Sequence, residues 1–106
     1  MSFVVIAKLT AKPETQQQLQ ELITQTAKAS WLEAGLLKYI LVKDPNQPHS
    51  FVLVEFFNSE ADYILHRDSS HLNNFRSQVS ELLAGEPEVF RGAPALAQLD
   101  PKAGIN

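Results

Sequence analysis

The sequence contains no cysteine, and its apolar runs are far shorter than the roughly 20 residues that a membrane-spanning helix needs. Disulfides, thiolate catalysis and cysteine-ligated zinc or iron–sulfur sites are therefore excluded within this chain. Lysine and arginine are also few: nine scattered residues, with a formal net charge of −3, form no basic stripe for nucleic acid. We therefore expect neither a membrane nor a nucleic acid as a partner.

The N-terminus gives no sign of a signal peptide. Residues 1–6 contain an apolar run but lack a basic n-region and a small-residue cleavage site, so the expected location is the cytoplasm. A chain of 106 residues with 44% hydrophobic residues has the size and composition of one soluble domain. We expect a single domain over residues 1–99 and a loose C-terminal tail over residues 100–106.

Three segments have the composition of β-strands. Residues 3–9, 36–43 and 50–57 are rich in β-branched and aromatic side chains. Residues 44–49 between the last two are dense in turn formers, which predicts an antiparallel hairpin with a longer loop. A weaker pattern over residues 88–99 indicates a possible final strand, in which Val89, Phe90, Leu96 and Leu99 are the apolar positions.

The first helix is predicted between the first two strands. Pro13 suits its opening, and Thr15 with Gln18 has the spacing of a capping box. Apolar side chains then recur at helical spacing along one face. Gly35 suits a left-handed residue that ends this helix.

Two further helical segments follow the third strand. The first is short, is capped by Asn58 or Ser59, and ends near His66. The second is capped within residues 68–70, has apolar side chains at helical spacing, and stops at Gly85. The element order is therefore β-α-β-β-α-β, which predicts an α+β, ferredoxin-like antiparallel sheet with the helices on one face.

The third strand is apolar on both of its sides. Phe51, Leu53, Glu55 and Phe57 share one side, and valines and Phe56 share the other. A sheet that is apolar on both faces needs a cover on each, and the helices cover only one. The simplest second cover is another copy of the chain, so we expect a homodimer that packs sheet against sheet with two-fold symmetry.

Glu55 is an acid in an otherwise apolar strand, which is costly unless it is paired, protonated or functional. The helical segment after it contains His66, and a sheet–helix sandwich would bring the two side chains together around a cavity. Two interpretations stay open from the residues alone. The pair transfers protons for a reaction, or it is a buried hydrogen-bonded pair that only fixes the helix on the sheet.

His71 lies five residues beyond His66, about 140° around a continuous helix, which is not the spacing of helical metal ligands. A break at Asp68 weakens that objection, so a metal site made by His66, His71 and Glu55 is the lesser alternative. The sequence also lacks a nucleotide-binding fingerprint and a Ser-His-Asp order. We therefore expect no metal and no cofactor.

Several short motifs match a known family. They are Glu33-x-Gly35, Tyr39, Phe51-x-Leu53-x-Glu55, Ser59-Glu60-Ala61 and His66-x-x-Ser69-x-His71-x-x-x-Phe75. In this combination the sequence resembles the antibiotic biosynthesis monooxygenase domain over residues 3–90. The resemblance implies a dimeric α/β barrel. The superfamily includes cofactor-independent quinol or anthrone monooxygenases, haem-degrading enzymes and a small-sugar-phosphate isomerase.

Departures from these patterns narrow the choice. The haem-degrading branch uses an asparagine on the first strand, a tryptophan in the short helix and a histidine later in the last helix. This chain has no asparagine in residues 1–9, has His66 where that tryptophan would fall, and has no histidine after His71. Haem degradation is therefore disfavoured. A separate departure concerns the monooxygenase members, which often have a tryptophan where this chain has Phe57.

The resemblance implies a cofactor-independent monooxygenase that acts on a small aromatic quinol-type substrate. His66 or Glu55 would remove a proton, and the electron-rich anion would react directly with oxygen. The residues expected to bind the substrate are Tyr39, Phe51, Leu53, Phe57, His71 and Phe75. Two alternatives remain: an isomerase that uses the same acid–histidine pair, and a non-catalytic dimeric module that binds an apolar ligand.

Overall fold

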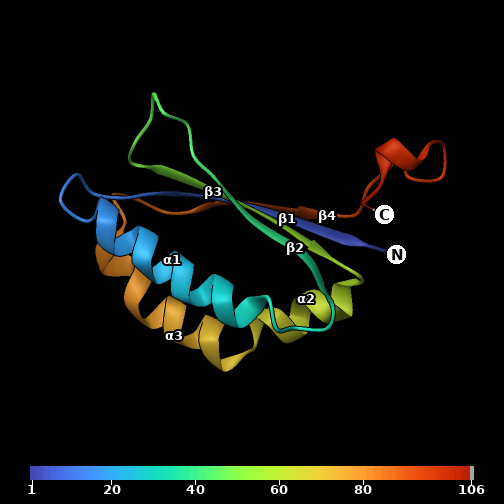
Figure 1. Ribbon diagram of the computed structural model, residues 1–106, viewed down its shortest axis with the longest axis horizontal. Coiled ribbons are helices and arrows are strands. Elements are labelled where there is room, and N and C mark those ends of the chain that lie inside the picture. The colour runs from blue at the N-terminus through green and yellow to red at the C-terminus, as the bar shows by residue number, and fades with distance from the viewer. Residues whose placement is uncertain (106) are drawn as a thin grey trace.

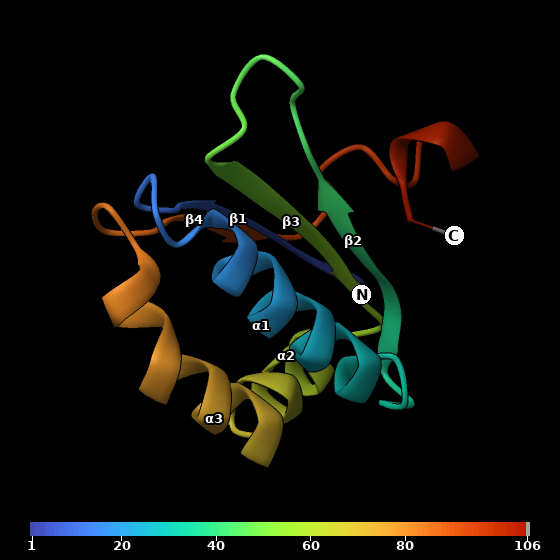
Figure 2. The same ribbon diagram turned by 60° about the vertical axis from the view of Figure 1, so that its left-hand side comes forward.

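The computed structural model describes residues 1–105, which form a sheet layer and a helix layer (Figure 1). The elements are β1 (Phe3–Thr10), α1 (Gln16–Ser30), β2 (Leu36–Val42), β3 (Ser50–Phe57), α2 (Glu60–Arg67), α3 (Ser70–Val79), the 3-10 turn η1 (Ser80–Leu82), β4 (Glu88–Gly92) and η2 (Pro101–Ala103). The predicted ferredoxin-like order is confirmed, with the second helix divided into α2 and α3. Helices α1 and α3 run side by side beneath the sheet (Figure 2).

The four strands form one antiparallel sheet in the order β2-β3-β1-β4. Its register places Glu55 of β3 opposite Tyr39 of β2 on one side and opposite Val5 of β1 on the other. Val5 is in turn opposite Arg91 of β4. One row across the sheet, on the face toward the helices, therefore presents Tyr39, Glu55, Val5 and Arg91 in that order.

The hydrophobic core lies between the sheet and helices α1 and α3. Alternate residues of β3 are buried, as the two-residue period of a strand requires, and Phe51 and Leu53 meet Leu19 and Ile23 of α1 there. Phe51 and Phe57, the first and last of these alternate β3 residues, are both fully buried. Glu55 is the one acid among these alternate residues, so the two-residue period of the strand places it under the helix layer.

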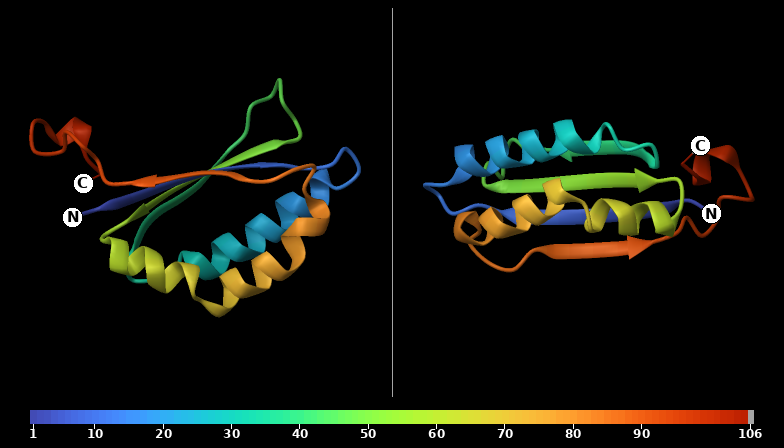
Figure 3. Two further views of the ribbon diagram at one scale, coloured as in Figure 1. Left: turned by 180° about the vertical axis from the view of Figure 1, so that it is seen from behind. Right: turned by 90° about the horizontal axis from the view of Figure 1, so that it is seen from below.

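No α-helix covers the opposite face of the sheet in the described chain, and the tail that contains η2 lies only at one end of this face (Figure 3). The register puts Ile6 of β1 beside Val54 of β3 and Phe90 of β4, which makes this face apolar. Phe90 is 67% exposed and Val42 at the other edge is 47% exposed. Exposure of this many large apolar side chains on one sheet face is unusual for a monomer. No helix within residues 1–105 is long and apolar enough to cross a membrane.

Two predictions about the first helix are wrong. The side chain of Thr15 makes no cap hydrogen bond, because its hydroxyl donates to the carbonyl of Leu82 at 2.6 Å and so ties the start of α1 to η1. Gly35 does not end α1 in a left-handed conformation. The helix ends at Ser30 with Trp31 in the right-handed region, and Gly35 has no positive φ. The indole N–H of Trp31 donates to the carbonyl of Tyr39 at 3.2 Å.

The two later caps are as predicted. Ser59 accepts a hydrogen bond from the backbone N–H of Asp62, and Ser69 accepts one from that of Leu72. The final strand is shorter than the predicted pattern, since β4 ends at Gly92 and both Leu96 and Leu99 lie in the turns that follow. The described part of the tail contains η2, and Asn106 lies outside the described residues.

Gly35 is required for a reason other than backbone freedom. A β-carbon at this position would lie 2.2 Å from Cγ and 2.5 Å from Cβ of Asp62, in the first turn of α2. Rotation of the Asp62 side chain relieves the first contact but not the second, so α2 would have to move. Gly35 therefore sets how closely α2, which contains His66, approaches the turn after α1.

We expect Gly35→Ala to lower the free energy of unfolding by about 1–3 kcal/mol, the usual cost of forcing extra volume into a packed region. Gly85→Ala is the matched control, because a β-carbon there meets nothing within 4 Å. Thermal or urea unfolding of both variants measures the difference. Equal stability of the two variants would contradict the close-packing role of Gly35.

Candidate active site

A cavity of about 490 Å³ lies between the sheet and helices α2 and α3. Its walls are mostly apolar and include Ala7, Leu9, Leu53, Leu72, Phe75 and Val79. Tyr39, Glu55 and His66 form a polar group within this lining. The volume lies within the range of small-molecule sites, so the cavity can enclose a small organic ligand.

The structure brings together five of the eight residues predicted for the site. Glu55, His66, Tyr39, Leu53 and Phe75 all line the cavity.

The other three residues, Phe51, Phe57 and His71, do not line it. Phe51 is fully buried in the core. Phe57 is also fully buried, because the rings of Tyr63 and His66 pack against it at centroid distances of 5.6 and 5.2 Å. His71 points instead toward an acid outside the cavity lining.

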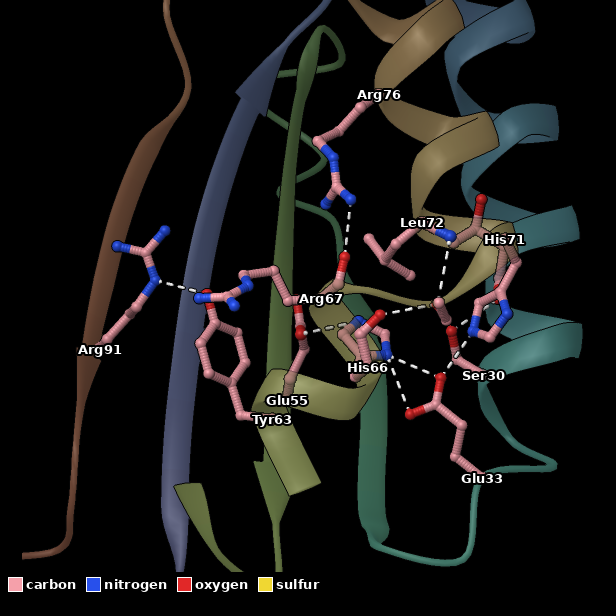
Figure 4. Close-up of polar contacts among 12 residues, drawn as sticks. Ser30, Glu33, Glu55, Tyr63, His66, Arg67, His71, Leu72, Arg76 and Arg91 are labelled. Carbon is pink, nitrogen blue, oxygen red and sulfur yellow. Dashed lines mark hydrogen bonds and ion pairs between the residues drawn. The ribbon is translucent and has the colours of Figure 1, made fainter. Parts of the chain in front are cut away.

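That acid is Glu33, in the turn after α1. Its carboxylate lies 2.8 Å from Nδ1 of His66 and 2.6 Å from Nε2 of His71 (Figure 4). A carboxylate only accepts hydrogen bonds, so each imidazole donates an N–H to it. Glu33 therefore links three segments: the turn after α1, the end of α2 and the first turn of α3.

The hydrogen bond from Nδ1 fixes the tautomer and orientation of His66. Its other nitrogen, Nε2, faces Oε1 of Glu55 at 3.5 Å. With the proton held on Nδ1, neutral His66 presents the lone pair of Nε2 toward Glu55. The 3.5 Å separation is longer than a good hydrogen bond, so the two groups are neighbours that do not fully satisfy one another. His66 is 2% exposed and Glu55 is 6% exposed.

Burial changes the acidity of these groups in opposite directions. It raises the pKa of Glu55 to about 7; the charge of Glu33 acts in the same direction and that of Arg91 against it. Burial lowers the pKa of His66, although its hydrogen bond to Glu33 opposes this. Near pH 7, His66 is therefore neutral and Glu55 exchanges readily between its acid and its carboxylate.

Tyr39 has a phenol beside this pair, with its ring centroid 5.7 Å from that of His66. Burial raises the pKa of Tyr39 far above its ordinary value, and the charges of Glu55 and Glu33 add to the effect. The phenol therefore keeps its proton throughout the physiological range. It can donate a hydrogen bond but cannot act as a base.

Glu33, His66 and His71 also form the type of donor set, two imidazoles and a carboxylate, that zinc or iron accepts. One donor atom from each lies within 4.8 Å of the others. The 2.6 and 2.8 Å separations are, however, those of hydrogen bonds, so a cation there has to displace two protons. The set considered from the sequence used Glu55, which instead lies on the other side of the His66 ring.

Sequence reasoning named Glu33 only as part of a motif and gave it no role. Its partners lie 33 and 38 residues further along the chain, and no local periodicity shows that a turn will contact two later helices. The Glu33-x-Gly35 motif was the available signal, because its glycine allows α2 to pack against the turn. Tyr63 and Arg91 also line the cavity and were not predicted.

Comparison with known proteins agrees with this fold. The family model described as antibiotic biosynthesis monooxygenase matches residues 2–78. The Bacillus subtilis (strain 168) protein named "Putative monooxygenase YcnE" is 26% identical over 88 residues, which are 83% of this chain and 93% of that protein.

Two solved structures are also similar. Rv0793 from Mycobacterium tuberculosis superposes with a TM-score of 0.84 at 30% identity, over 89% of this chain and 95% of that one. PA3566 from Pseudomonas aeruginosa gives a TM-score of 0.80 at 25% identity, over 86% and 91% of the two chains. The sequence match covers most of the fold and includes Glu33, Glu55, His66 and His71. The chain belongs to the antibiotic biosynthesis monooxygenase family.

Proposed function

We propose that the protein is a cofactor-independent monooxygenase that acts on a small aromatic quinol-type substrate. One observation carries this proposal: neutral His66, oriented by Glu33, and Glu55 with its raised pKa both line a largely apolar cavity of about 490 Å³. The apolar walls of such a cavity can pack against a flat ring. Membership of the family supports the monooxygenase class, and the acid–base pair and apolar walls are compatible with the quinol-type substrate that the resemblance implies.

In this mechanism the substrate hydroxyl lies near the polar pair and Nε2 of His66 accepts its proton. The quinolate anion then transfers electrons to O2 and forms a carbon–oxygen bond at a ring carbon. Loss of water from the resulting peroxide leaves a hydroxylated quinone. One substrate molecule and one O2 give one quinone with an added oxygen and one H2O, so the substrate supplies all the electrons.

Glu55 serves as the second proton carrier. Its pKa of about 7 allows it to take a proton in one step and return it in another at neutral pH. The peroxide needs a proton on its departing oxygen, and a protonated Glu55 near the cavity supplies one. Arrangement around a cavity favours this role over a buried pair that only joins helix to sheet.

We also propose that the protein is a homodimer. The apolar sheet face that includes Ile6, Val54 and Phe90 is covered within residues 1–105 only at one end, by the tail that contains η2. A second copy packed sheet against sheet with two-fold symmetry would cover the rest of this face on both chains. Such an association would leave the cavity, on the opposite face of the sheet, with the helix layer of its own chain.

Oxygen consumption with a panel of hydroquinones tests the reaction. We expect uptake in a 1:1 ratio to substrate, unchanged by EDTA, and a roughly 10²- to 10⁴-fold lower kcat in His66→Ala. Glu33→Ala should also lower kcat, because the acceptor that orients His66 is lost. His49→Ala, in the loop between β2 and β3, is the control. Uptake no faster than buffer would refute the proposed quinol reaction. Turnover that continues without oxygen would exclude a monooxygenase reaction and indicate an isomerase.

The raised pKa of Glu55 predicts a pH-dependent stability. The folded protein holds the proton of Glu55 more tightly than the unfolded chain does. The stabilisation of the fold by this proton is therefore complete below pH 4.5 and is lost as pH rises through about 7. A shift of one pKa unit corresponds to about 1.4 kcal/mol. The free energy of unfolding of Glu55→Gln, relative to that of the wild type, should therefore rise by about 3 kcal/mol between pH 4.5 and pH 8. Urea unfolding across this range measures it, with exposed Glu86→Gln as the control. Parallel curves for wild type and Glu55→Gln would show that Glu55 is not held protonated.

Light scattering at micromolar concentration tests the dimer. The expected mass is twice the 11.8 kDa of one chain. Phe90→Glu should shift the protein toward monomer, because it places a charge on the apolar face. Leu65→Glu is the matched control, since Leu65 is similarly exposed, at 71%, but lies on α2. A wild-type mass of one chain would refute the dimer.

A further inference from the structure

Three arginines from three elements line the largely apolar cavity: Arg67 of α2, Arg76 of α3 and Arg91 of β4. Figure 4 shows Arg67 beside Glu55, Arg91 on the far side of Tyr63, and Arg76 reaching toward Arg67 from α3. All three are solvent-exposed, so they lie where the cavity meets water. Cations concentrated on one rim attract an anion from solution.

Only one of the three is neutralised by an acid. Arg67 makes two bonds to Asp68, at 2.9 and 3.2 Å. Arg91 donates from Nε to the hydroxyl of Tyr63 at 2.8 Å, which positions its guanidinium but leaves its charge uncompensated.

Arg76 donates to two neutral oxygens, the carbonyl of Arg67 at 2.7 Å and Oδ1 of Asn73 at 2.6 Å. Among residues 1–105, neither Arg76 nor Arg91 has a carboxylate within 4.0 Å. A guanidinium has five N–H donors, so both arginines retain donors for a ligand.

The acids of the cavity do not cancel this charge. The lining contains two of them, Glu55 and Asp68, and Asp68 is already bound by Arg67. Glu55 lies at the polar end with His66, where burial keeps it partly protonated. The cavity therefore combines an acid–base pair, an apolar middle and a positively charged rim.

We propose that the substrate is an aromatic acid: a ring system whose hydroxyl lies at His66 and Glu55 and whose carboxylate is bound by Arg91 and Arg76. The part of this inference that places the substrate hydroxyl at His66 and Glu55 rests on the proposed function. Arginine binds a carboxylate through two parallel hydrogen bonds, which fixes the direction in which the ligand enters.

The sheet register sets the distance between Glu55 and Arg91, the groups expected at the two ends of the substrate. Glu55 and Arg91 are both opposite Val5, one on each side of β1, so their backbones lie two strand spacings apart, about 10 Å. That separation is comparable with the length of a fused two-ring aromatic that has polar groups at its two ends. Val5 of β1 lies between the two ends and presents only an apolar side chain to the cavity.

Binding of three probes of one shape tests the inference: 6-hydroxy-2-naphthoate, its methyl ester, and 2-naphthol, each titrated by fluorescence or calorimetry without oxygen. The acid should bind roughly 10- to 100-fold more tightly than the ester, as expected for hydrogen bonds to a charged group. Arg91→Gln and Arg76→Gln should each remove most of this preference, and added salt should weaken it. Arg67→Gln should retain it, because Arg67 is already paired with Asp68.

Equal affinity for acid and ester in the wild type, or equal loss in Arg67→Gln and Arg91→Gln, would overturn the inference. Unchanged melting temperatures establish that each arginine variant is folded. The two proposals fail separately in this design. Selective binding of the acid with no oxygen uptake refutes the monooxygenase reaction alone, and oxidation of quinols without preference for the acid refutes the arginine site alone.

Discussion

The double hydrogen bond to the Glu33 carboxylate is the interaction on which the rest of the site depends. It holds His66 and His71, from two different helices, against a single turn. Without this acceptor, two imidazole N–H groups in a largely buried setting would lose their partner, at about 1–3 kcal/mol each. With it, the ring of His66 is fixed so that Nε2 points at Glu55. The orientation of the acid–base pair is therefore set from outside the cavity.

Burial shifts the pKa values of the two members of that pair in opposite directions. The same removal of water that keeps His66 neutral keeps Glu55 partly protonated, because each group loses solvation of its charged form. A base and an acid thus lie side by side near neutral pH. The sequence left open whether this pair is chemical or structural. The cavity beside it and the 3.5 Å gap between the two groups favour the chemical interpretation.

Residues whose role depends on local pattern were predictable, and residues whose role depends on distant contacts were not. The two-residue period of β3 correctly places Glu55 beneath the helices, and serine spacing correctly gives the caps at Ser59 and Ser69. Glu33 was missed because its partners are more than 30 residues away. Gly35 was misread because a glycine required by a close neighbour looks the same in sequence as one required by its own φ.

Trp31 has a consequence for how the protein can be observed. It is the single tryptophan of the chain, two residues before Glu33, and its indole donates to the backbone of Tyr39. The ring of Tyr39 lies next to that of His66. A displacement of the turn or of β2 on ligand entry therefore changes the surroundings of one fluorophore, whose emission reports the state of the site without any added label.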